Sequence, residues 1–403
     1  MKELSILGST GSIGVQALSI CRDHPHQFRI RALACGGADL KSFAEQLVAF
    51  DVPFGAIARG SVEDLDAAIR TEETRRSKPH MERQLRSGHE GVIEAAIQAP
   101  TGTVLNGITG GIGLDPSLAA LTAGATLALA NKESLIVGGH LIKQACQRPA
   151  QIIPVDSEHS AIQQALAAGN HRRGLTVGTV DGTTDVRRLI LTASGGPFRG
   201  RTRKELDRVT ADQALKHPTW SMGPVVTINS STLINKALEL IEAQILFDMP
   251  ASSIEVTVHP QSIVHSLVEF IDGSTLAQAS PPDMRLPIAL GLTLPQRLDR
   301  VASPCNWDEA TQWTFEPVDE QTFPAISLAR QAVSSTPTHP AVLNAANEVC
   351  VEAFLHERIR YLQIVDTVAQ VLSEHVGLDN PTRDDISMVT QWATIRTEEI
   401  IAA

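Results

Sequence analysis

The stretch LSILGSTGSIG, residues 4–14, decides the fold of the amino-terminal part of this 403-residue chain. Leu4–Leu7 has the composition of a short buried strand, three glycines follow, and helix-forming residues run from Val15 to Cys21. Glycines allow a tight turn and a close approach of the backbone to a ligand, and a helix amino terminus attracts an anion. The stretch therefore predicts a cradle for a dinucleotide or a phosphate. The alternative is a purely structural turn, since the glycine spacing is GxxGxxG and not GxGxxG.

The alternation of strand and helix continues beyond this cradle. Strands are expected at residues 28–34, 103–106 and 126–130. We therefore expect an α/β protein whose residues 1–153 form a Rossmann-like dinucleotide-binding domain. Open α/β sheets bind ligands at the carboxyl ends of their strands. The polar residues that follow strand 126–130 are Asn131, Lys132 and Glu133.

The end of the second expected strand bears on the choice of dinucleotide. In an NAD-binding domain an Asp or Glu at this place holds the ribose 2′-hydroxyl. Here Cys35 is followed by Gly36, Gly37 and Ala38, and Asp39 comes later, at an expected helix start. The missing acid favours NADP over NAD, although no Lys or Arg stands there to hold the 2′-phosphate.

A second informative stretch is PVDSEHS, residues 154–160, which follows the apolar pair Ile152 and Ile153. Asp156 and Glu158 are two residues apart, so extended backbone would direct both carboxylates to one side. Two carboxylates on one side repel each other, and a hard divalent cation relieves that repulsion. The alternative is a solvated acidic loop that caps a helix beginning near Ser160.

After residue 154 the pattern is that of an α+β domain, expected over residues 154–293. Its strands are expected at 189–193, 254–258, 266–271 and 275–279. Ser194 follows the first of them in a glycine turn suited to an anion, and Asp272-Gly273 is a hairpin signal. His265 is a candidate for a functional role, and the alternative is a hydrogen-bonded histidine of the core.

The loop HPTWSMGP, residues 217–224, places Trp and Met between two prolines, with His directly before the first, in a chain with only 4% aromatic residues. This composition predicts a loop that closes over a ligand. The alternative is the hydrophobic anchor of a surface loop.

One helix is expected over residues 229–243. Asn235, Glu239 and Glu242 fall at i, i+4 and i+7 and so share one stripe of it. An Asn-Lys pair beside a Ser-Ser-Thr start offers a phosphate site, and Glu239 offers a third carboxylate for a cation. The alternative is a surface helix whose stripe serves solubility.

The carboxyl-terminal part of the chain differs from the rest. Residues 294–318 are loop-rich and are expected to be a linker, and residues 319–403 are expected to be a small helical bundle. Its helices are predicted at 325–334, 340–355, 364–374 and 384–403. Asn344, Asn347 and Glu348 are predicted to form an exposed polar stripe.

Composition excludes several classes of function. The net charge is −11 and charges of both signs are mixed, which argues against nucleic-acid binding. The five cysteines are scattered without a CxxC pair, as in proteins of a reducing compartment. No signal peptide or membrane-spanning run is evident, so the expected location is the cytoplasm, without a membrane partner.

Eight motifs, taken in order, carry a resemblance to a known family. They are GSTGSIG (8–14), LANKES (129–134), PVDSEHSA (154–161), SGGPFR (194–199), KHPTWSMG (216–223), NSSTLINKALELIEA (229–243), HPQSIVHS (259–266) and PPDMR (281–285). Together they resemble the 1-deoxy-D-xylulose 5-phosphate reductoisomerases, and the linker and helical tail fit that family to the end of the chain. The resemblance implies an enzyme that rearranges and reduces 1-deoxy-D-xylulose 5-phosphate, a sugar phosphate, to 2-C-methyl-D-erythritol 4-phosphate in the non-mevalonate route to isoprenoids. It implies NADPH and Mg²⁺, Mn²⁺ or Co²⁺ as cofactors, and a homodimer whose interface lies in the middle domain.

The resemblance also implies roles for individual residues. The implied metal ligands are Asp156, Glu158 and Glu239, which with Lys132 are the implied catalytic residues. The implied substrate-binding residues are Lys132, Ser157, Glu158, Ser194, His217, Trp220, Met222, Ser230, Asn235, Lys236, Glu239, His265 and Met284. The implied cofactor-binding residues are Thr10, Gly11, Ser12, Ile13, Gly36, Gly37, Ala38, Asn131, Glu133 and Gly223. Trp220 and Met222 belong to the implied lid.

The sequence departs from the family pattern at one place. Many members carry a Lys or Arg and then an Asn after the glycine that ends the second strand, where this chain has Gly37 and Ala38.

Two other kinds of protein remain as alternatives. A metal-dependent aldolase or hydrolase would share the carboxylates but not the dinucleotide cradle, and a nucleotide-sensing regulator would need only the cradle.

Overall fold

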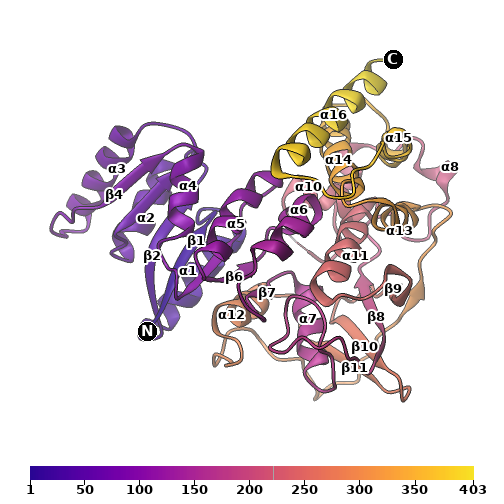
Figure 1. Cartoon of the computed structure of the whole chain (residues 1–403), viewed down its shortest axis with the longest axis horizontal. Coiled ribbons are helices and arrows are strands. Elements are labelled where there is room, and N and C mark those ends of the chain that lie inside the picture. The colour runs from indigo at the N-terminus through magenta and orange to yellow at the C-terminus, as the bar shows by residue number, and fades with distance from the viewer. Residues whose placement is uncertain (221) are drawn as a thin grey trace. The chain divides into compact units, whose positions relative to one another are not determined.

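Figure 1 shows the computed structural model of the chain, which describes residues 1–220 and 222–403. Ser221, part of the predicted closing loop, lies outside the described residues. The chain divides into two compact units. The first comprises residues 1–134, 142–160 and 283–302, and the second comprises residues 135–141, 161–282 and 303–403. The finer division at residues 153, 293 and 318 stays a prediction.

The first unit is built on a parallel sheet of seven strands. They are β1 (Lys2–Leu7), β2 (Phe28–Cys35), β3 (Phe54–Ile57), β4 (Gln84–Ser87), β5 (Thr103–Asn106), β6 (Thr126–Leu129) and β7 (Ile152–Pro154). Their order is β4-β3-β2-β1-β5-β6-β7, and all six neighbouring pairs are parallel. Apart from the added edge strand β4, this is the doubly wound order of dinucleotide-binding domains. The predicted Rossmann-like fold is therefore confirmed.

Two strands of this sheet were not predicted. β3 is only four residues long and contains Gly55, and β4 is a polar edge strand with both ends exposed. β3 is an apolar run at the lower limit of strand length, and β4 shows neither an alternation nor an apolar run, so each gives only a weak strand signal in the sequence.

Helices connect the strands of the first unit. They are α1 (Ser12–Asp23), α2 (Leu40–Ala49), α3 (Val62–Arg75), α4 (His89–Ala96), η1 (Gly111–Gly113), α5 (Leu114–Thr122) and α6 (Lys132–Ala145). After the last strand come α7 (Ser157–Leu166) and, much later in the chain, α12 (Arg285–Thr293). Residues 135–141 of α6 and 161–166 of α7 belong to the second unit. Asp39 is the N-cap of α2, as predicted, and its side chain accepts a hydrogen bond of 3.0 Å from the Ser42 N–H.

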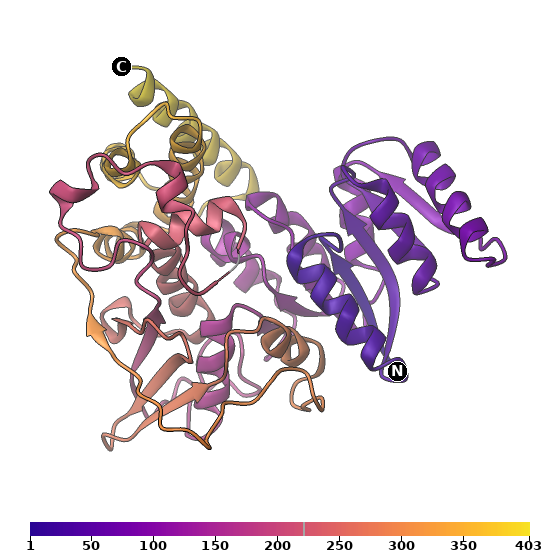
Figure 2. The ribbon, with the colours of Figure 1, turned by 180° about the vertical axis from the view of Figure 1, so that it is seen from behind.

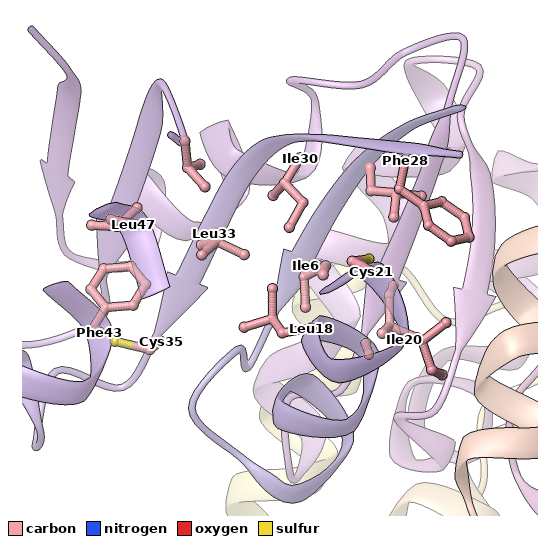
Figure 3. Packing of buried hydrophobic residues seen from close by; sticks show 14 of the residues in the cluster. Ile6, Leu18, Ile20, Cys21, Phe28, Ile30, Leu33, Cys35, Phe43 and Leu47 are labelled. Carbon is pink, nitrogen blue, oxygen red and sulfur yellow. The ribbon is translucent and has the colours of Figure 1, made fainter. Parts of the chain in front are cut away.

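The core of the first unit lies between the sheet and its helices. Ile6 of β1, Leu33 of β2 and Leu18 of α1 are 0–2% exposed and belong to one apolar cluster, part of which Figure 3 shows. Ile288 and Leu292 of α12 belong to the same cluster. Each such side chain stabilises the fold by about 1.5–3 kcal/mol. The chain therefore returns to the first unit after residue 282 because α12 carries apolar side chains that complete this core.

The second unit contains a mixed sheet of five strands. They are β8 (Val186–Ala193), β9 (Ile254–Val258), β10 (Val264–Phe270), β11 (Thr275–Ala279) and β12 (Glu316–Pro317), in the order β11-β10-β8-β9-β12. β8 and β9 are parallel, and β10 is antiparallel to both β8 and β11. The predicted hairpin at Asp272-Gly273 is confirmed, since the Phe270 N–H donates to the Ser274 carbonyl at 2.9 Å.

The remaining helices of the second unit are α8 (Arg203–Leu206), α9 (Ala211–Ala214), α10 (Pro224–Ser231), α11 (Ile234–Phe247), η2 (Ala251–Ser253), α13 (Ala325–Ser335), α14 (His339–Leu355), α15 (Tyr361–Glu374) and α16 (Arg383–Ala402). The last four, orange to yellow in Figures 1 and 2, form the predicted carboxyl-terminal bundle, in which α14 packs against α13, α15 and α16. Within residues 1–220 and 222–403, no helix combines the length and the apolar character needed to cross a membrane.

The prediction of one helix over residues 229–243 is wrong. α10 ends at Ser231, Leu233 has a left-handed φ of 60°, and α11 begins at Ile234. The hydroxyl groups of Ser231 and Thr232 donate back to the Ile228 carbonyl, at 2.7 and 3.3 Å. Such side-chain bonds compete with the helical backbone pattern and favour a helix end. The break separates Ser230, on the last turn of α10, from Asn235, on the first turn of α11.

Two polar stripes are more deeply buried than solubility would require. Glu239 and Glu242 of α11 are each 1% exposed, so the alternative of a solubilising surface stripe is excluded. The predicted exposure of Asn344 and Asn347 is likewise wrong, because these side chains are 3% and 1% exposed. Asn347 donates a hydrogen bond of 2.9 Å to the Asn229 side chain on α10, and this contact between helices explains its burial.

Candidate functional site

The predicted cradle lies at the carboxyl end of β1, beside the point where the sheet order reverses. The Gly107 N–H donates to the Leu7 carbonyl at 2.9 Å, so the loops after β1 and β5 meet there. A β-carbon on Gly14 would overlap the Gly8 carbonyl and the Ser9 backbone, which shows how closely α1 approaches the turn. Gly11, the N-cap of α1, provides no side-chain cap. These features fit the pyrophosphate of a dinucleotide, whose oxygens accept from helix amino-terminal N–H groups.

The other predicted cofactor residues of the first unit surround the carboxyl ends of its strands. Thr10 and Gly11 lie in the turn from β1 to α1, Ser12 and Ile13 begin α1, and Gly36, Gly37 and Ala38 follow β2. Asn131 is the N-cap of α6, and its side chain donates to the Ile108 and Gly110 carbonyls at 2.7 and 2.9 Å. It thereby fixes the loop after β5. Burial raises the pKa of the neighbouring Glu133 carboxyl above its ordinary value.

Asn106, at the end of β5, has a role that was not predicted from the sequence. It is fully buried, and its side chain donates to the Gly113 carbonyl at 2.9 Å and to the Ser117 hydroxyl at 2.8 Å. Its oxygen accepts from the Ile108 N–H at 3.1 Å. The signal available was a polar residue at the carboxyl end of a buried strand, where a loop needs internal hydrogen bonds.

The loops after β6 and β7 bring a lysine to the acidic stretch. Lys132 Nζ lies 2.6 Å from the Asp156 carboxylate, and the two side chains are 16% and 13% exposed. Lys132 and Asp156 follow neighbouring parallel strands, which explains why residues so far apart in the sequence meet. In this half-buried setting an ammonium–carboxylate pair is stronger than on an open surface.

The extended backbone predicted between Asp156 and Glu158 is wrong, because α7 begins at Ser157. The Ser160 N–H donates to the Asp156 carbonyl at 2.9 Å, so Asp156 opens the helix. Carboxylate oxygens of Asp156 and Glu158 nevertheless lie within 4.8 Å of each other. The positive end of the α7 dipole stabilises both anions, and the Ser157 hydroxyl donates to Glu158.

In the second unit, His217 joins the predicted phosphate-binding serines. Its Nε2 lies 3.1 Å from the Ser194 hydroxyl and 3.0 Å from the Ser230 hydroxyl. Its Nδ1 accepts from the backbone N–H groups of Thr219 and Trp220, at 3.1 and 2.9 Å. A nitrogen that accepts carries no proton, so neutral His217 has its proton on Nε2. The imidazole therefore both orders the turn over residues 217–220 and presents an N–H to the serines.

The pKa of His217 is lowered by burial from the ordinary histidine value of 6.5. Because neutral imidazole is favoured in the folded protein, its stabilisation of the turn is full above that value and declines as the pH falls through the lower, folded-state pKa. We expect nitrogen NMR to find the Nε2–H tautomer at neutral pH and a titration midpoint below 6.5. An Nδ1–H tautomer, or a midpoint above 6.5, would contradict this assignment.

Lys236 and Glu239 form a buried ion pair on α11, with side chains 5% and 1% exposed. The Asn235 amide donates to the other Glu239 oxygen at 2.5 Å. α11 thus carries an amide, an ammonium and a carboxylate within two turns, and both charges are kept from solvent. Groups held so rigidly suit the binding of an anion or a cation better than mobile surface charges do.

The remaining predicted residues lie outside the clusters described above. The rings of Trp220 and His265 lie 6.2 Å apart, and the His265 Nε2 lies 3.0 Å from the Ser280 carbonyl. The structure therefore agrees with the alternative of a hydrogen-bonded core histidine. Met222 is half-buried and Gly223 is the exposed N-cap of α10. Met284 packs against the apolar cluster of the first unit.

Three family descriptions match successive parts of the chain. Residues 4–139 match the 1-deoxy-D-xylulose 5-phosphate reductoisomerase family, residues 152–247 its C-terminal domain, and residues 279–396 the DXP reductoisomerase C-terminal domain. Together they span both units.

Relatives of the same name match over nearly the full length. The 1-deoxy-D-xylulose 5-phosphate reductoisomerase of Beutenbergia cavernae is 54% identical, with 98% of this chain and 96% of that protein covered. The enzymes of the same name from an Arthrobacter species and from Cutibacterium acnes are 51% and 50% identical, with all of this chain and 98% and 99% of those proteins covered.

Solved structures of reductoisomerases also match this chain. The 1-deoxy-D-xylulose 5-phosphate reductoisomerase of Zymomonas mobilis in complex with NADPH superposes with a TM-score of 0.86 at 34% identity, covering 99% of each chain. A DOX-P reductoisomerase in complex with NADPH, fosmidomycin and magnesium gives 0.85 at 34% identity, covering 100% of this chain and 98% of that one. The alternatives of an aldolase, a hydrolase or a regulator are thereby excluded. The chain belongs to the 1-deoxy-D-xylulose 5-phosphate reductoisomerase family.

Proposed function

We propose that this chain converts 1-deoxy-D-xylulose 5-phosphate to 2-C-methyl-D-erythritol 4-phosphate, with NADPH and a divalent cation, as a step of isoprenoid precursor synthesis. The proposal rests on the match to reductoisomerases that are 54% and 51% identical in sequence over 98% and 100% of this chain. The reaction rearranges the carbon skeleton to a branched aldehyde and then reduces that aldehyde. It therefore needs a site for a metal and substrate and a separate site for a dinucleotide.

We assign the metal site to Asp156, Glu158 and Glu239. Three carboxylates provide the oxygen ligands that Mg²⁺ and Mn²⁺ prefer. When bound, the cation supplies a Lewis acid toward the ketone and its neighbouring hydroxyl. Lys132, paired with Asp156 at 2.6 Å, holds that carboxylate in place and offers N–H groups to a substrate oxygen. Ser157, beside Glu158, is assigned to substrate binding.

We assign the phosphate of the substrate to side chains of the second unit. They are Ser194, His217, Ser230, Asn235 and Lys236. The hydroxyls and the His217 N–H provide neutral donors, and Lys236 provides the charge. The phosphate does not react, so its binding energy is available to order the site around the reacting carbons.

We assign the dinucleotide to the cradle of the first unit, where it supplies the hydride. The residues in question are Thr10, Gly11, Ser12, Ile13, Gly36, Gly37, Ala38, Asn131 and Glu133, with Gly223 from the second unit. Trp220 and Met222 form the lid that excludes water from the hydride path. His265 and Met284 are assigned to substrate binding on the family resemblance alone.

The assembly and location of the protein are further parts of the proposal. Family resemblance supports a homodimer whose interface lies within residues 154–293. Scattered free cysteines and the absence of a membrane-spanning helix among the described residues support the cytoplasm.

The test is an assay of NADPH oxidation with purified protein and 1-deoxy-D-xylulose 5-phosphate, with and without Mn²⁺. We expect oxidation only when substrate and cation are both present, and formation of 2-C-methyl-D-erythritol 4-phosphate. Oxidation without the cation, or no turnover with all components, would overturn the proposal.

A further inference from the structure

The ends of β2 and β3 place an arginine next to Gly37. The two strands are parallel neighbours, and Cys35 is paired with Ile57 at their carboxyl ends. The Ala58 N–H donates to the Cys35 carbonyl at 2.9 Å, which continues the pairing by one residue. Arg59 then lies beside Gly37, so close that a β-carbon on Gly37 would overlap the Arg59 carbonyl oxygen.

Gly37 itself is unsuited to a side chain. Its φ is +92°, a region that residues with a β-carbon rarely adopt, and the overlapping neighbour is backbone that has no rotamer to change. A lysine or arginine at this position would therefore strain the turn. The turn as built in this chain has no room for a base at residue 37, so a base that serves the same place would come from another segment.

The backbone around Arg59 is fixed on its other side by β4. The Ser87 hydroxyl donates to the Gly60 carbonyl at 2.6 Å, and the Gly88 N–H donates to the Ile57 carbonyl at 2.9 Å. The Arg59 side chain is exposed, and it has no ion-pair partner anywhere in residues 1–220 and 222–403. A guanidinium on a fixed backbone, uncommitted to any carboxylate, is available to a ligand.

The nearby acidic residue, Asp39, caps helix α2. The Asp39 carboxylate accepts from the Ser42 N–H at 3.0 Å and from the Ser42 hydroxyl at 2.6 Å, as the cap of α2. These hydrogen bonds lower the pKa of Asp39 below its ordinary value, so it is ionised at neutral pH. Lys41, in the first turn of α2, is a positive charge near Asp39, in addition to that of Arg59.

We propose that Arg59 binds the 2′-phosphate of NADPH and determines the preference of this chain for NADPH over NADH. In dinucleotide-binding domains the ribose 2′ position lies at the end of the second strand, where an arginine accommodates the phosphate. The planar guanidinium matches two phosphate oxygens at once, which a lysine ammonium does not. The proposal rests on the use of NADPH given above. Arg59, in the loop after β3, supplies the contact that Gly37 and Ala38 do not supply after β2.

The experiment measures binding as well as activity. Dissociation constants of NADPH and NADH are determined by fluorescence titration for the wild type, Arg59→Ala and Arg59→Lys. We expect Arg59→Ala to weaken NADPH binding about tenfold, or ~1.4 kcal/mol, and to change NADH binding less than about twofold. Arg59→Lys should recover part of the loss. The control is Arg29→Ala, an exposed arginine near the opposite end of β2, which should alter neither constant.

A second pair of probes isolates the phosphate. Calorimetry with adenosine 2′,5′-bisphosphate and with AMP should show that Arg59→Ala weakens binding of the bisphosphate alone. Equal losses for both probes would place Arg59 at the adenine or ribose and overturn the proposal, and so would unchanged NADPH binding in Arg59→Ala. A wild type that binds neither dinucleotide would instead refute the proposed function itself.

Discussion

Asp156→Asn is expected to lower kcat/KM by about a hundredfold or more while leaving the NADPH dissociation constant within about twofold of the wild type. Changes to residues that merely support metal ligands cost 10–100-fold, and Asp156 is assigned as a ligand itself. The substitution also removes the charge that pairs with Lys132 at 2.6 Å, so the ammonium loses its anchor. The cradle is built from other loops of the sheet, which is why cofactor binding should persist. Steady-state kinetics and fluorescence titration measure the two effects.

Binding of Mn²⁺, followed by electron paramagnetic resonance, separates loss of the metal from loss of catalysis. We expect Asp156→Asn to bind Mn²⁺ far more weakly than the wild type. Asp66→Asn is the matched control, since Asp66 is also an ion-paired acid of the first unit, bonded to Arg70 at 2.7 Å on the exposed face of α3. Undiminished Mn²⁺ binding in Asp156→Asn would refute the ligand assignment.

Lys236→Ala is expected to reduce both stability and turnover. Removing one partner of a buried ion pair costs about 3–5 kcal/mol, because the other charge stays desolvated. The Lys236 and Glu239 side chains are 5% and 1% exposed, so that penalty applies here with little screening by solvent. As the proposed charge on the substrate phosphate, Lys236 should also affect kcat together with KM. Urea denaturation and kinetics test the two effects.

The double variant Lys236→Met/Glu239→Gln distinguishes these two roles. Replacing both charges by neutral groups of similar size removes the unpaired buried carboxylate, so most of the lost stability should return. Turnover should not return, since the proposed phosphate contact and the proposed metal ligand are both missing. A Lys236→Ala protein as stable as the wild type, or an active double variant, would be evidence against this account.

The sequence by itself determined the features that depend on near neighbours in the chain. The strand, glycine turn and helix at residues 4–21 follow from local composition, as do the Asp39 cap and the hairpin at Asp272-Gly273. Eight motifs in order also identified the family correctly. Each of these signals is contained in a short stretch, because hydrophobic periodicity, caps and turns involve residues only a few positions apart.

The tertiary structure decided which distant residues meet. The burial of Asn347 follows from its hydrogen bond with Asn229, 118 positions away, and no periodicity within α14 records it. The contacts of Lys132 with Asp156 and of Arg59 with Gly37 arise because parallel strands end at one edge of a sheet. Burial and the sites of charges are properties of packing between elements, and packing depends on pairings that a linear pattern of residues does not encode locally.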